Sequence, residues 1–270
     1  VQPTVLALGD RLLCTVGHSA PRSSGRLSDR GLRITGSIPA LELNEAAHWG
    51  NLGDWGQSAS YLNAARKLAT RLGYTAALKP SECILDLGSG YGSQLRFWHD
   101  TFEVGAIDTV EPNDTAREHA QKFNRKSPIP IQWLPSINEA KSTYDAVLSL
   151  DAAYHFPDRR ALFARCFDLL KPKGRLVLND LLLAAPSTPG ARLLKRISGI
   201  FGIPSTNLKS REVYQQELEE IGFEEVSFQI STRYGELNFK NYPLIVTGSP
   251  SNFDLPNRQT ILLNMVSKTK

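Results

Sequence analysis

Residues 83–98 combine a carboxylate with three closely spaced glycines, a pattern that can bind a nucleotide-like ligand. The apolar residues before Asp86 predict a buried strand, and Gly88, Gly90 and Gly92 follow it as a loop that can lead into a helix. Glycine adopts positive φ angles and lets a ligand approach the backbone, where a Cβ atom would collide. Such a loop at the end of a first parallel strand is typical of nucleotide sites in α/β sheets.

The spacing of these glycines differs from the dinucleotide fingerprint G-x-G-x-x-G. Counted from Gly88, the third glycine of that fingerprint would stand at Ser93, whereas the chain has Gly92. The carboxylate of Asp86 would also repel an incoming pyrophosphate. We therefore expect a cationic ligand without phosphates, such as S-adenosylmethionine with its sulfonium and ammonium groups. A tight strand–helix turn that binds no ligand is the alternative interpretation.

A second carboxylate, Glu111 in the stretch T-V-E-P-N, ends the next predicted strand, 19 positions after Gly92. A carboxylate at this point can accept hydrogen bonds from both ribose hydroxyls of an adenosine, as in other nucleotide-binding α/β folds. The alternative is a solvated acid at the end of a strand. Glu111 thus favours an adenosyl ligand without separating NAD from S-adenosylmethionine.

The stretch D-L-G-S-G-Y-G resembles motif I, D/E-x-G-x-G-x-G, of class I S-adenosylmethionine-dependent methyltransferases. The resemblance implies S-adenosyl-L-methionine as the cofactor. In that family an acid at the end of the third strand commonly meets the adenine amino group. Here Ser136 stands in its place, and Ile137 is expected to pack on the ring. Together with the end of the fourth strand, these stretches imply the following cofactor-binding residues: Asp86, Gly88, Ser89, Gly90, Glu111, Pro112, Ser136, Ile137 and Leu150.

The end of the fourth predicted strand carries a second motif, D-A-A-Y-H-F-P-D-R at residues 151–159. An apolar strand delivers Asp151, Tyr154 and His155 to the same edge of the sheet as the glycine loop. The motif resembles small-molecule methyltransferases of the sugar and natural-product type, including the tocopherol methyltransferase-like group. This resemblance implies that His155 faces the methyl acceptor and pairs with Asp180, just after the apolar core of the fifth strand.

A hydroxyl becomes a good nucleophile when a base removes its proton, and a neutral histidine is the natural base near pH 7. A buried aspartate can hold the tautomer of that histidine and stabilise its charged form. His155 and Asp180 therefore predict O-methylation with this pair as the catalytic residues. The alternatives are a structural histidine, and a helix cap or surface acid.

Residues 48–61, before the first strand, read H-W-G-N-L-G-D-W-G-Q-S-A-S-Y and resemble the aromatic entrance of the same methyltransferases. The resemblance implies that Trp55 and Tyr61 close over the methionine end of the cofactor, where an aromatic face attracts the sulfonium. Ordinary core aromatics are the alternative interpretation.

Strand-like and helical segments alternate along the chain, which predicts an α/β fold with a parallel sheet. With the resemblance, we expect a Rossmann-like, seven-stranded, mostly parallel sheet with helices on both faces and the last strand antiparallel. The predicted strands are residues 83–87, 104–110, 129–134, 144–150, 175–183, 224–231 and 260–266. The predicted helices begin near residue 58 and span residues 94–101, 114–124, 159–170 and 210–221.

We expect residues 1–57 to form an N-terminal arm or lid and residues 58–270 to form one methyltransferase domain. Within this domain we expect a substrate cap near residues 186–210 and an irregular loop at residues 232–258. The cap contains the basic, amphipathic segment 191–203, which predicts a lid over an apolar or amphipathic acceptor. A helix that lies on a membrane surface is the alternative.

The composition of this 270-residue chain disfavours several classes of protein. Its net charge is +4, with basic and acidic residues interleaved, so we expect no nucleic-acid partner. Three scattered cysteines without metal-ligand spacing favour a reduced, intracellular and cytoplasmic enzyme that holds no metal ion. No apolar run reaches the roughly 18 residues that a membrane-spanning helix needs.

These features predict an S-adenosylmethionine-dependent methyltransferase of secondary metabolism that acts on a small-molecule hydroxyl. The first alternative is an N- or C-methyltransferase of an amine, lipid or sterol-like acceptor. A further alternative is an NAD(P)-dependent reductase or a non-catalytic nucleotide-binding domain.

Overall fold

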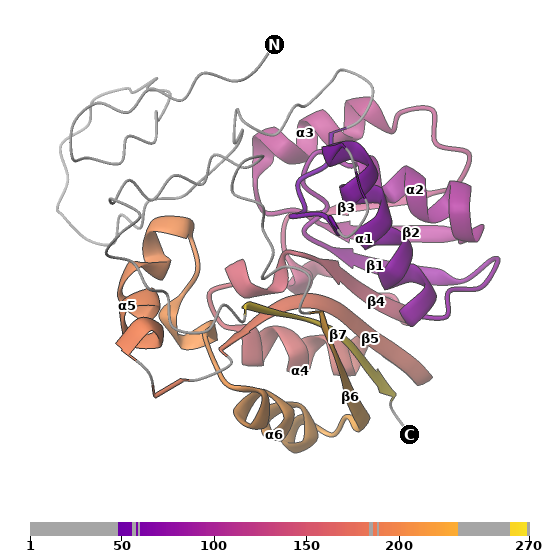
Figure 1. Ribbon diagram of the computed structural model, residues 1–270. Helices are drawn as coiled ribbons and strands as arrows, with labels where there is room; N and C mark the ends of the chain where they lie inside the picture. The colour runs from indigo at the N-terminus through magenta and orange to yellow at the C-terminus, as the bar shows by residue number, and fades with distance from the viewer. Residues whose placement is uncertain are drawn as a thin grey trace, which may run out of the picture.

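The computed structural model describes residues 48–55, 58, 60–183, 186–187, 189–231 and 260–268. These residues form an α/β fold around a sheet with the strand order β3-β2-β1-β4-β5-β7-β6 (Figure 1). Strands β1 to β5 are parallel to one another, whereas β7 runs antiparallel to both β5 and β6. The expected α/β fold with a mostly parallel sheet is therefore confirmed.

The bounds of the elements follow the predicted ones closely. The strands are β1 (Cys83–Leu87), β2 (Ala106–Val110), β3 (Ile131–Leu134), β4 (Tyr144–Leu150), β5 (Leu170–Leu183), β6 (Glu224–Ser231) and β7 (Thr260–Lys268). The α-helices are α1 (Tyr61–Thr75), α2 (Ser93–Phe102), α3 (Asp114–Phe123), α4 (Arg159–Leu169), α5 (Pro189–Ile197) and α6 (Arg211–Ile221). The described residues also form the short 3₁₀ helices η1 (Ile137–Glu139), η2 (Ala153–His155), η3 (Ser198–Phe201) and η4 (Ser205–Asn207).

Three strand starts differ from the expectation: β2 begins two residues later than predicted, and β3 and β5 differ for physical reasons. β3 begins at Ile131 because Pro130 before it has no N–H to donate to the ladder. β5 begins at Leu170, directly after α4, because this buried leucine already pairs with Tyr144 of β4. The stretch K-P-K-G, which the predicted bounds leave between a helix and a strand, is thus the first part of a strand.

Two apolar layers cover the sheet, because successive side chains of each strand point to opposite faces. In β1, Ile84 belongs to the layer that contains α1 and α2. Its neighbours Leu85 and Leu87 belong to the layer that contains Phe163 of α4 and Tyr214 of α6. Figure 1 shows α1 and α2 apart from α4 and α6, with the sheet between the two pairs. The ends of β1 and β4 are therefore held from both sides.

The helices around the expected site begin with the caps that the sequence indicates. The side chain of Asn113 accepts a hydrogen bond from the N–H of Ala116 at 2.9 Å, which caps α3. The side chain of Asp158 caps α4 in the same way, through the N–H of Ala161 at 2.9 Å. These caps fix where the chain leaves the ends of β2 and β4.

The expected cap near residues 186–210 contains α5, η3 and η4. Its last part returns to the sheet, since the N–H of Leu183 at the end of β5 donates to the carbonyl of Lys209 at 2.9 Å. The expected arm up to residue 47 and the irregular loop at residues 232–258 lie outside the described residues. In the described part of the chain, none of the helices is long and apolar enough to cross a membrane.

Candidate functional site

The glycine loop between β1 and α2 uses its glycines in two different ways. A Cβ atom on Gly88 would lie 2.4 Å from the Cβ of Ala152, and one on Gly92 would lie 2.8 Å from the Cβ of Ala120. A Cβ atom on Gly90, whose φ angle is 54°, would meet no described atom within 4 Å. Packing therefore requires Gly88 and Gly92, whereas Gly90 leaves its backbone open to a ligand.

Glu111, at the end of β2, holds the glycine loop in place. Its Oε2 accepts a hydrogen bond from the N–H of Gly90 at 2.8 Å, and its Oε1 accepts one from the N–H of Asn113 at 2.9 Å. Burial raises the pKa of Glu111, although these two hydrogen bonds and the charge of Arg117 oppose the shift. Each carboxylate oxygen keeps a lone pair with which it can accept a further hydrogen bond.

Asp86 lies inside β1 and is fully buried. Its two oxygens accept hydrogen bonds from Nε2 of Gln94 and from Nε1 of Trp98, each at 2.7 Å. Burial raises the pKa of Asp86 to about 6, and the charge of Glu111 adds to this, whereas both hydrogen bonds oppose it. The structure therefore gives Asp86 the role of fastening α2 to β1, a role that the sequence did not indicate.

Several buried polar atoms beside the glycine loop have no hydrogen-bond partner among the described residues. They include the hydroxyl oxygens of Ser89 and Ser93 and Oδ1 of Asp151, and all three residues are more than nine-tenths buried. A buried polar atom without a partner costs free energy, so such atoms indicate a place where a ligand or water binds. The Ser89 hydroxyl and the Asp151 oxygen suit the polar end of a cofactor.

Asp151 follows β4 directly. The sequence placed it at this edge of the sheet but indicated no role for it. Its φ angle is 58°, in the left-handed region that favours glycine. Its Oδ2 accepts a hydrogen bond from the N–H of Leu52 at 2.7 Å, so it ties the segment before α1 to the sheet edge. Burial raises the pKa of Asp151 to about 7, with a smaller contribution from the charge of Asp180.

Trp55 and Tyr61 brace this same segment. The Tyr61 hydroxyl donates to the carbonyl of Asn51 at 2.7 Å, and Nε1 of Trp55 donates to the carbonyl of Leu52 at 2.9 Å. The two rings lie 6.3 Å apart between centroids, and both residues are half-buried. Their contact with a cofactor stays a prediction.

The other expected cofactor residues lie around the same edge. The Ser136 hydroxyl accepts a hydrogen bond from the N–H of Asn138 at 3.3 Å and so caps η1. Ile137 is 8% exposed and belongs to the apolar layer below η1. Pro112 is exposed, and Leu150 is buried in the opposite layer. None of these positions conflicts with a role in cofactor binding, which stays a prediction.

His155 ends the turn η2 and presents its ring to solvent. Its Nδ1 lies 3.1 Å from the carbonyl oxygen of Gly202 in the cap. Because a carbonyl only accepts, Nδ1 carries the proton and Nε2 keeps its lone pair. The ring is exposed, but the protein around it still displaces part of its water, and this desolvation lowers the pKa of His155. The Gly202 hydrogen bond and the charge of Asp180 oppose the shift.

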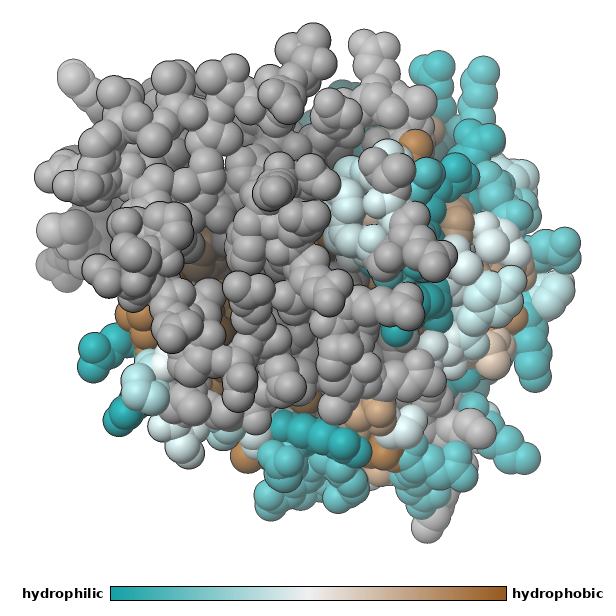
Figure 2. All heavy atoms as spheres, in the orientation of Figure 1, coloured by the Kyte–Doolittle hydropathy of each residue, from teal (hydrophilic) through white to brown (hydrophobic). Residues whose placement is uncertain are grey.

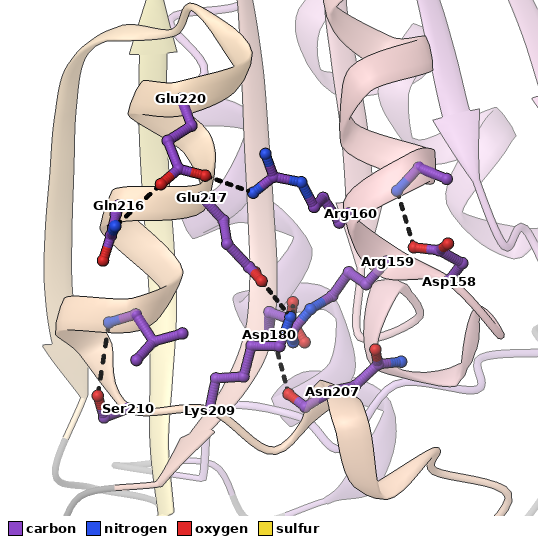
Figure 3. A network of polar contacts seen from close by, with 12 residues as sticks. Asp158, Arg159, Arg160, Asp180, Asn207, Lys209, Ser210, Gln216, Glu217 and Glu220 are labelled. Carbon is purple, nitrogen blue, oxygen red and sulfur yellow. Dashed lines mark hydrogen bonds and ion pairs between the residues drawn. The ribbon is translucent and has the colours of Figure 1, made fainter.

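Asp180 has different partners from the one we expected. Its Oδ2 accepts hydrogen bonds from Nη1 of Arg159 at 2.9 Å and from the Tyr214 hydroxyl, and its Oδ1 accepts one from the N–H of Leu181 at 2.7 Å. The carboxylate is fully buried, so it is neither a surface acid nor a helix cap. In place of the expected direct pair with His155, Asp180 pairs with Arg159 (Figure 3). Its negative charge still opposes the lowering of the pKa of His155.

Comparison with known proteins adds independent findings. The family model described as a methyltransferase domain matches residues 59–227. The chain is 31% identical to erythromycin 3''-O-methyltransferase of Saccharopolyspora erythraea over 65% of its own length and 62% of that protein's. It is 28% identical to phosphoethanolamine N-methyltransferase 3 of Arabidopsis thaliana, over 55% of its own length and 30% of that protein's.

A solved structure shares the fold. Mycolic acid cyclopropane synthase CmaA1, complexed with S-adenosylhomocysteine, superposes with a TM-score of 0.67 at 17% identity. The superposition covers 87% of this chain and 94% of the synthase. By contrast, the chain spans less than two thirds of the erythromycin relative and about a third of the phosphoethanolamine relative.

Proposed function

This chain belongs to the methyltransferase-domain family, and we propose that it transfers a methyl group from S-adenosylmethionine to a hydroxyl group of a small molecule. One observation carries the proposal: an open glycine loop held by Glu111 lies at the same sheet edge as the His155 turn. The likeness to an O-methyltransferase of a natural product supports both the activity and a place in secondary metabolism. The S-adenosylhomocysteine in the related fold supports the cofactor.

The residues at this edge fit S-adenosylmethionine. Glu111 has lone pairs left for the ribose hydroxyls, and the open backbone at Gly90 lets the ligand approach. The unpartnered oxygen of Asp151 suits an ammonium group, and the Ser89 hydroxyl lies beside the same polar end. When it is bound, S-adenosylmethionine supplies an electrophilic methyl group attached to a sulfonium.

His155 is the proposed general base. Its Nδ1 proton is engaged by the Gly202 carbonyl, so Nε2 is the atom that accepts the proton of the acceptor hydroxyl. Desolvation lowers the pKa of His155, which keeps the ring neutral and able to act as a base near pH 7. The negative charge of Asp180 then stabilises the imidazolium that forms.

The cap determines the acceptor in this proposal. Leu193, Leu194 and Ile200 are 45%, 39% and 48% exposed, which leaves apolar side chains on the surface of α5 and η3. Figure 2 shows hydrophobic and hydrophilic side chains next to one another at the left edge, where Figure 1 places α5. We therefore infer an apolar or amphipathic acceptor; contact with a membrane surface is the alternative use of the same helix.

An amine acceptor is the second candidate. The buried, unpartnered oxygen of Asp151 could bind an acceptor ammonium instead of the cofactor's, and one of the relatives is a phosphoethanolamine N-methyltransferase. An amine that has lost its proton in solution needs no base in the protein.

An intracellular, cytoplasmic location also stays a prediction.

Calorimetric titration with S-adenosylhomocysteine tests the cofactor, and NADPH serves as the comparison ligand. We expect S-adenosylhomocysteine to bind and NADPH not to bind; binding of NADPH alone would overturn the proposal in favour of a reductase. The acceptor is tested next, by transfer of labelled methyl to a macrolide with free sugar hydroxyls and to phosphoethanolamine. Labelling of phosphoethanolamine alone would replace the hydroxyl by an amine.

A further inference from the structure

A buried polar network joins the cap to α4 and β5 (Figure 3). One of its members, Asn207, also contacts the turn that carries His155. Arg159, Asp180 and Asn207 are 1%, 0% and 2% exposed. Nη1 of Arg159 donates to Asp180 at 2.9 Å, and Nη2 donates to the backbone carbonyl of Asn207 at 2.6 Å. The guanidinium also lies 4.2 Å from the ring centroid of Tyr214. One arginine at the start of α4 thus binds β5, α6 and the cap together.

The side chain of Asn207 holds the backbone on both sides of His155. Its Nδ2 donates to the carbonyl of Tyr154 at 3.0 Å and to the carbonyl of Phe156 at 2.7 Å. These carbonyls belong to the residues directly before and after His155. The two hydrogens of one amide group therefore fix the turn that presents the imidazole.

The cap holds the ring of His155 as well, through the carbonyl of Gly202. Only four residues lie between Gly202 and Asn207, so one short stretch of the cap binds both the ring and the backbone of the histidine. The cap cannot move away without breaking these hydrogen bonds. The position of His155 is therefore coupled to the position of the cap.

Burial of an ion pair is a poor way to stabilise a fold, because the loss of hydration roughly cancels the attraction. Nε of Arg159 is also buried and has no hydrogen-bond partner among the described residues. The buried ion pair is therefore better explained by a need to hold the cap and the His155 turn in one position than by a gain in stability. Only a donor such as the Asn207 amide can bind two carbonyls at once, because carbonyls accept and do not donate.

We propose that Asn207 is a positioning residue for the methyl transfer. The Arg159–Asp180 pair holds Asn207, and Asn207 orients His155 so that its Nδ1 is protonated and its Nε2 faces the acceptor. This inference rests on the proposed function of His155 as the base. Asn207 acts through the turn and not on the cofactor, since the hydrogen bonds of its amide go to Tyr154 and Phe156. Its loss should therefore change catalysis and leave cofactor affinity unchanged.

The test uses the variants Asn207→Ala and Asn207→Ser in the full chain, with Lys209→Ala as the matched control. Lys209 lies in the same part of the cap, but its side chain pairs with Glu217 of α6 and not with the His155 turn. The tautomer of His155 is read from ¹⁵N-histidine spectra, in which its signal is assigned by its absence in His155→Ala. S-adenosylhomocysteine affinity is measured by calorimetry on the same samples.

We expect wild type and Lys209→Ala to show the Nδ1–H tautomer, and both Asn207 variants to show a mixture of tautomers. Turnover should fall about 10- to 100-fold in the Asn207 variants, with the S-adenosylhomocysteine Kd within twofold of wild type. An unchanged His155 signal in a folded Asn207 variant would overturn the proposal. If Asn207→Ala is too unstable, Asn207→Ser provides the spectrum, because its hydroxyl can still donate a hydrogen bond to one of the two carbonyls. Failure of wild type to bind S-adenosylhomocysteine would instead count against the proposed function.

Discussion

Two halves of the sheet edge differ in the sequence separation of their contacts. The loop half comprises the glycine loop, Asp86 and Glu111, and the cap half comprises the His155 turn and the cap residues that bind it. In the loop half, Glu111 binds Gly90 across 21 positions of the chain, and Asp86 binds Gln94 across eight. In the cap half, His155 binds Gly202 across 47 positions, and Asn207 binds Tyr154 across 53. Local contacts leave a motif in the sequence, whereas distant ones depend on how the whole cap folds back.

This difference separates two tasks. The loop half offers the groups that suit a cofactor, which is the same for every methyltransferase of this kind. The cap half offers the proposed base and the apolar side chains that would meet an acceptor. In this proposal, changes in the cap alter the acceptor while the cofactor groups of the loop half stay intact. The predictions below test this independence.

Replacement of Arg159 by alanine has the largest expected effect, and it falls on the cap half. The change leaves the buried carboxylate of Asp180 without its cation, so the free energy of unfolding should fall by about 3–5 kcal/mol. Urea denaturation measures it. Arg160→Ala is the control, because its pair with Glu220 is 46% and 47% exposed and should contribute less than about 1 kcal/mol. Equal losses in the two variants would mean that burial does not distinguish the two pairs.

Replacement of His155 by alanine separates catalysis from cofactor binding. Methyl transfer to a hydroxyl should fall about 100-fold or more, whereas the Kd for S-adenosylhomocysteine should stay within twofold of wild type. His99→Ala is the matched control, since its Nδ1 also lies 3.1 Å from a backbone carbonyl, that of Val104. A loss of less than tenfold in His155→Ala would favour an amine acceptor.

The glycines of the loop separate packing from ligand access. Gly88→Ala should lower the free energy of unfolding by about 1–3 kcal/mol, because its φ is 77° and its Cβ would collide with Ala152. Gly90→Ala should cost about 1 kcal/mol or less, since its Cβ points into open space, yet it should weaken S-adenosylhomocysteine binding tenfold or more. Urea denaturation and calorimetry on both variants check the contrast. A Gly90→Ala variant that binds S-adenosylhomocysteine with the wild-type Kd would contradict this contrast between the two glycines.

Asp151, which ties the segment before α1 to the sheet edge, should make stability depend on pH. Burial raises its pKa to about 7 from an ordinary value of 3.8. The folded protein therefore keeps a proton that the unfolded chain releases, and the stability this provides is lost as the pH rises from about 3.8 to about 7.

Asp151→Asn cannot ionise, so it should be more stable than wild type at pH 8, by about 1 kcal/mol or more. The difference should shrink toward pH 4, where the wild-type carboxyl is protonated. Thermal unfolding across this pH range, with the exposed Asp100→Asn as control, measures the difference. A difference that does not change with pH would show that folding does not raise the pKa of Asp151.

The fold and half of the site were predictable from particular residues. Glu111 was expected at the end of its strand beside the glycine loop, and the structure places it there with Gly90 bound to it. His155 was expected at the same edge and lies there. The direct pair of His155 with Asp180 was not found. Arg159, twenty-one positions before Asp180, binds this carboxylate instead, and the sequence motif does not indicate that contact.

The sequence by itself determined the α/β order of the elements, the glycine loop and the acid that holds it, because periodicity, caps and short-range spacing encode them. Only the tertiary structure decided which partners His155, Asp180 and Asp151 have. Gly202 and Leu52 come from 47 and 99 positions away. Arg159 is only 21 positions from Asp180, but no motif indicates that its side chain points to this carboxylate. A hydrogen bond forms only within about 3 Å, and which distant group arrives within that distance depends on the packing of the whole chain.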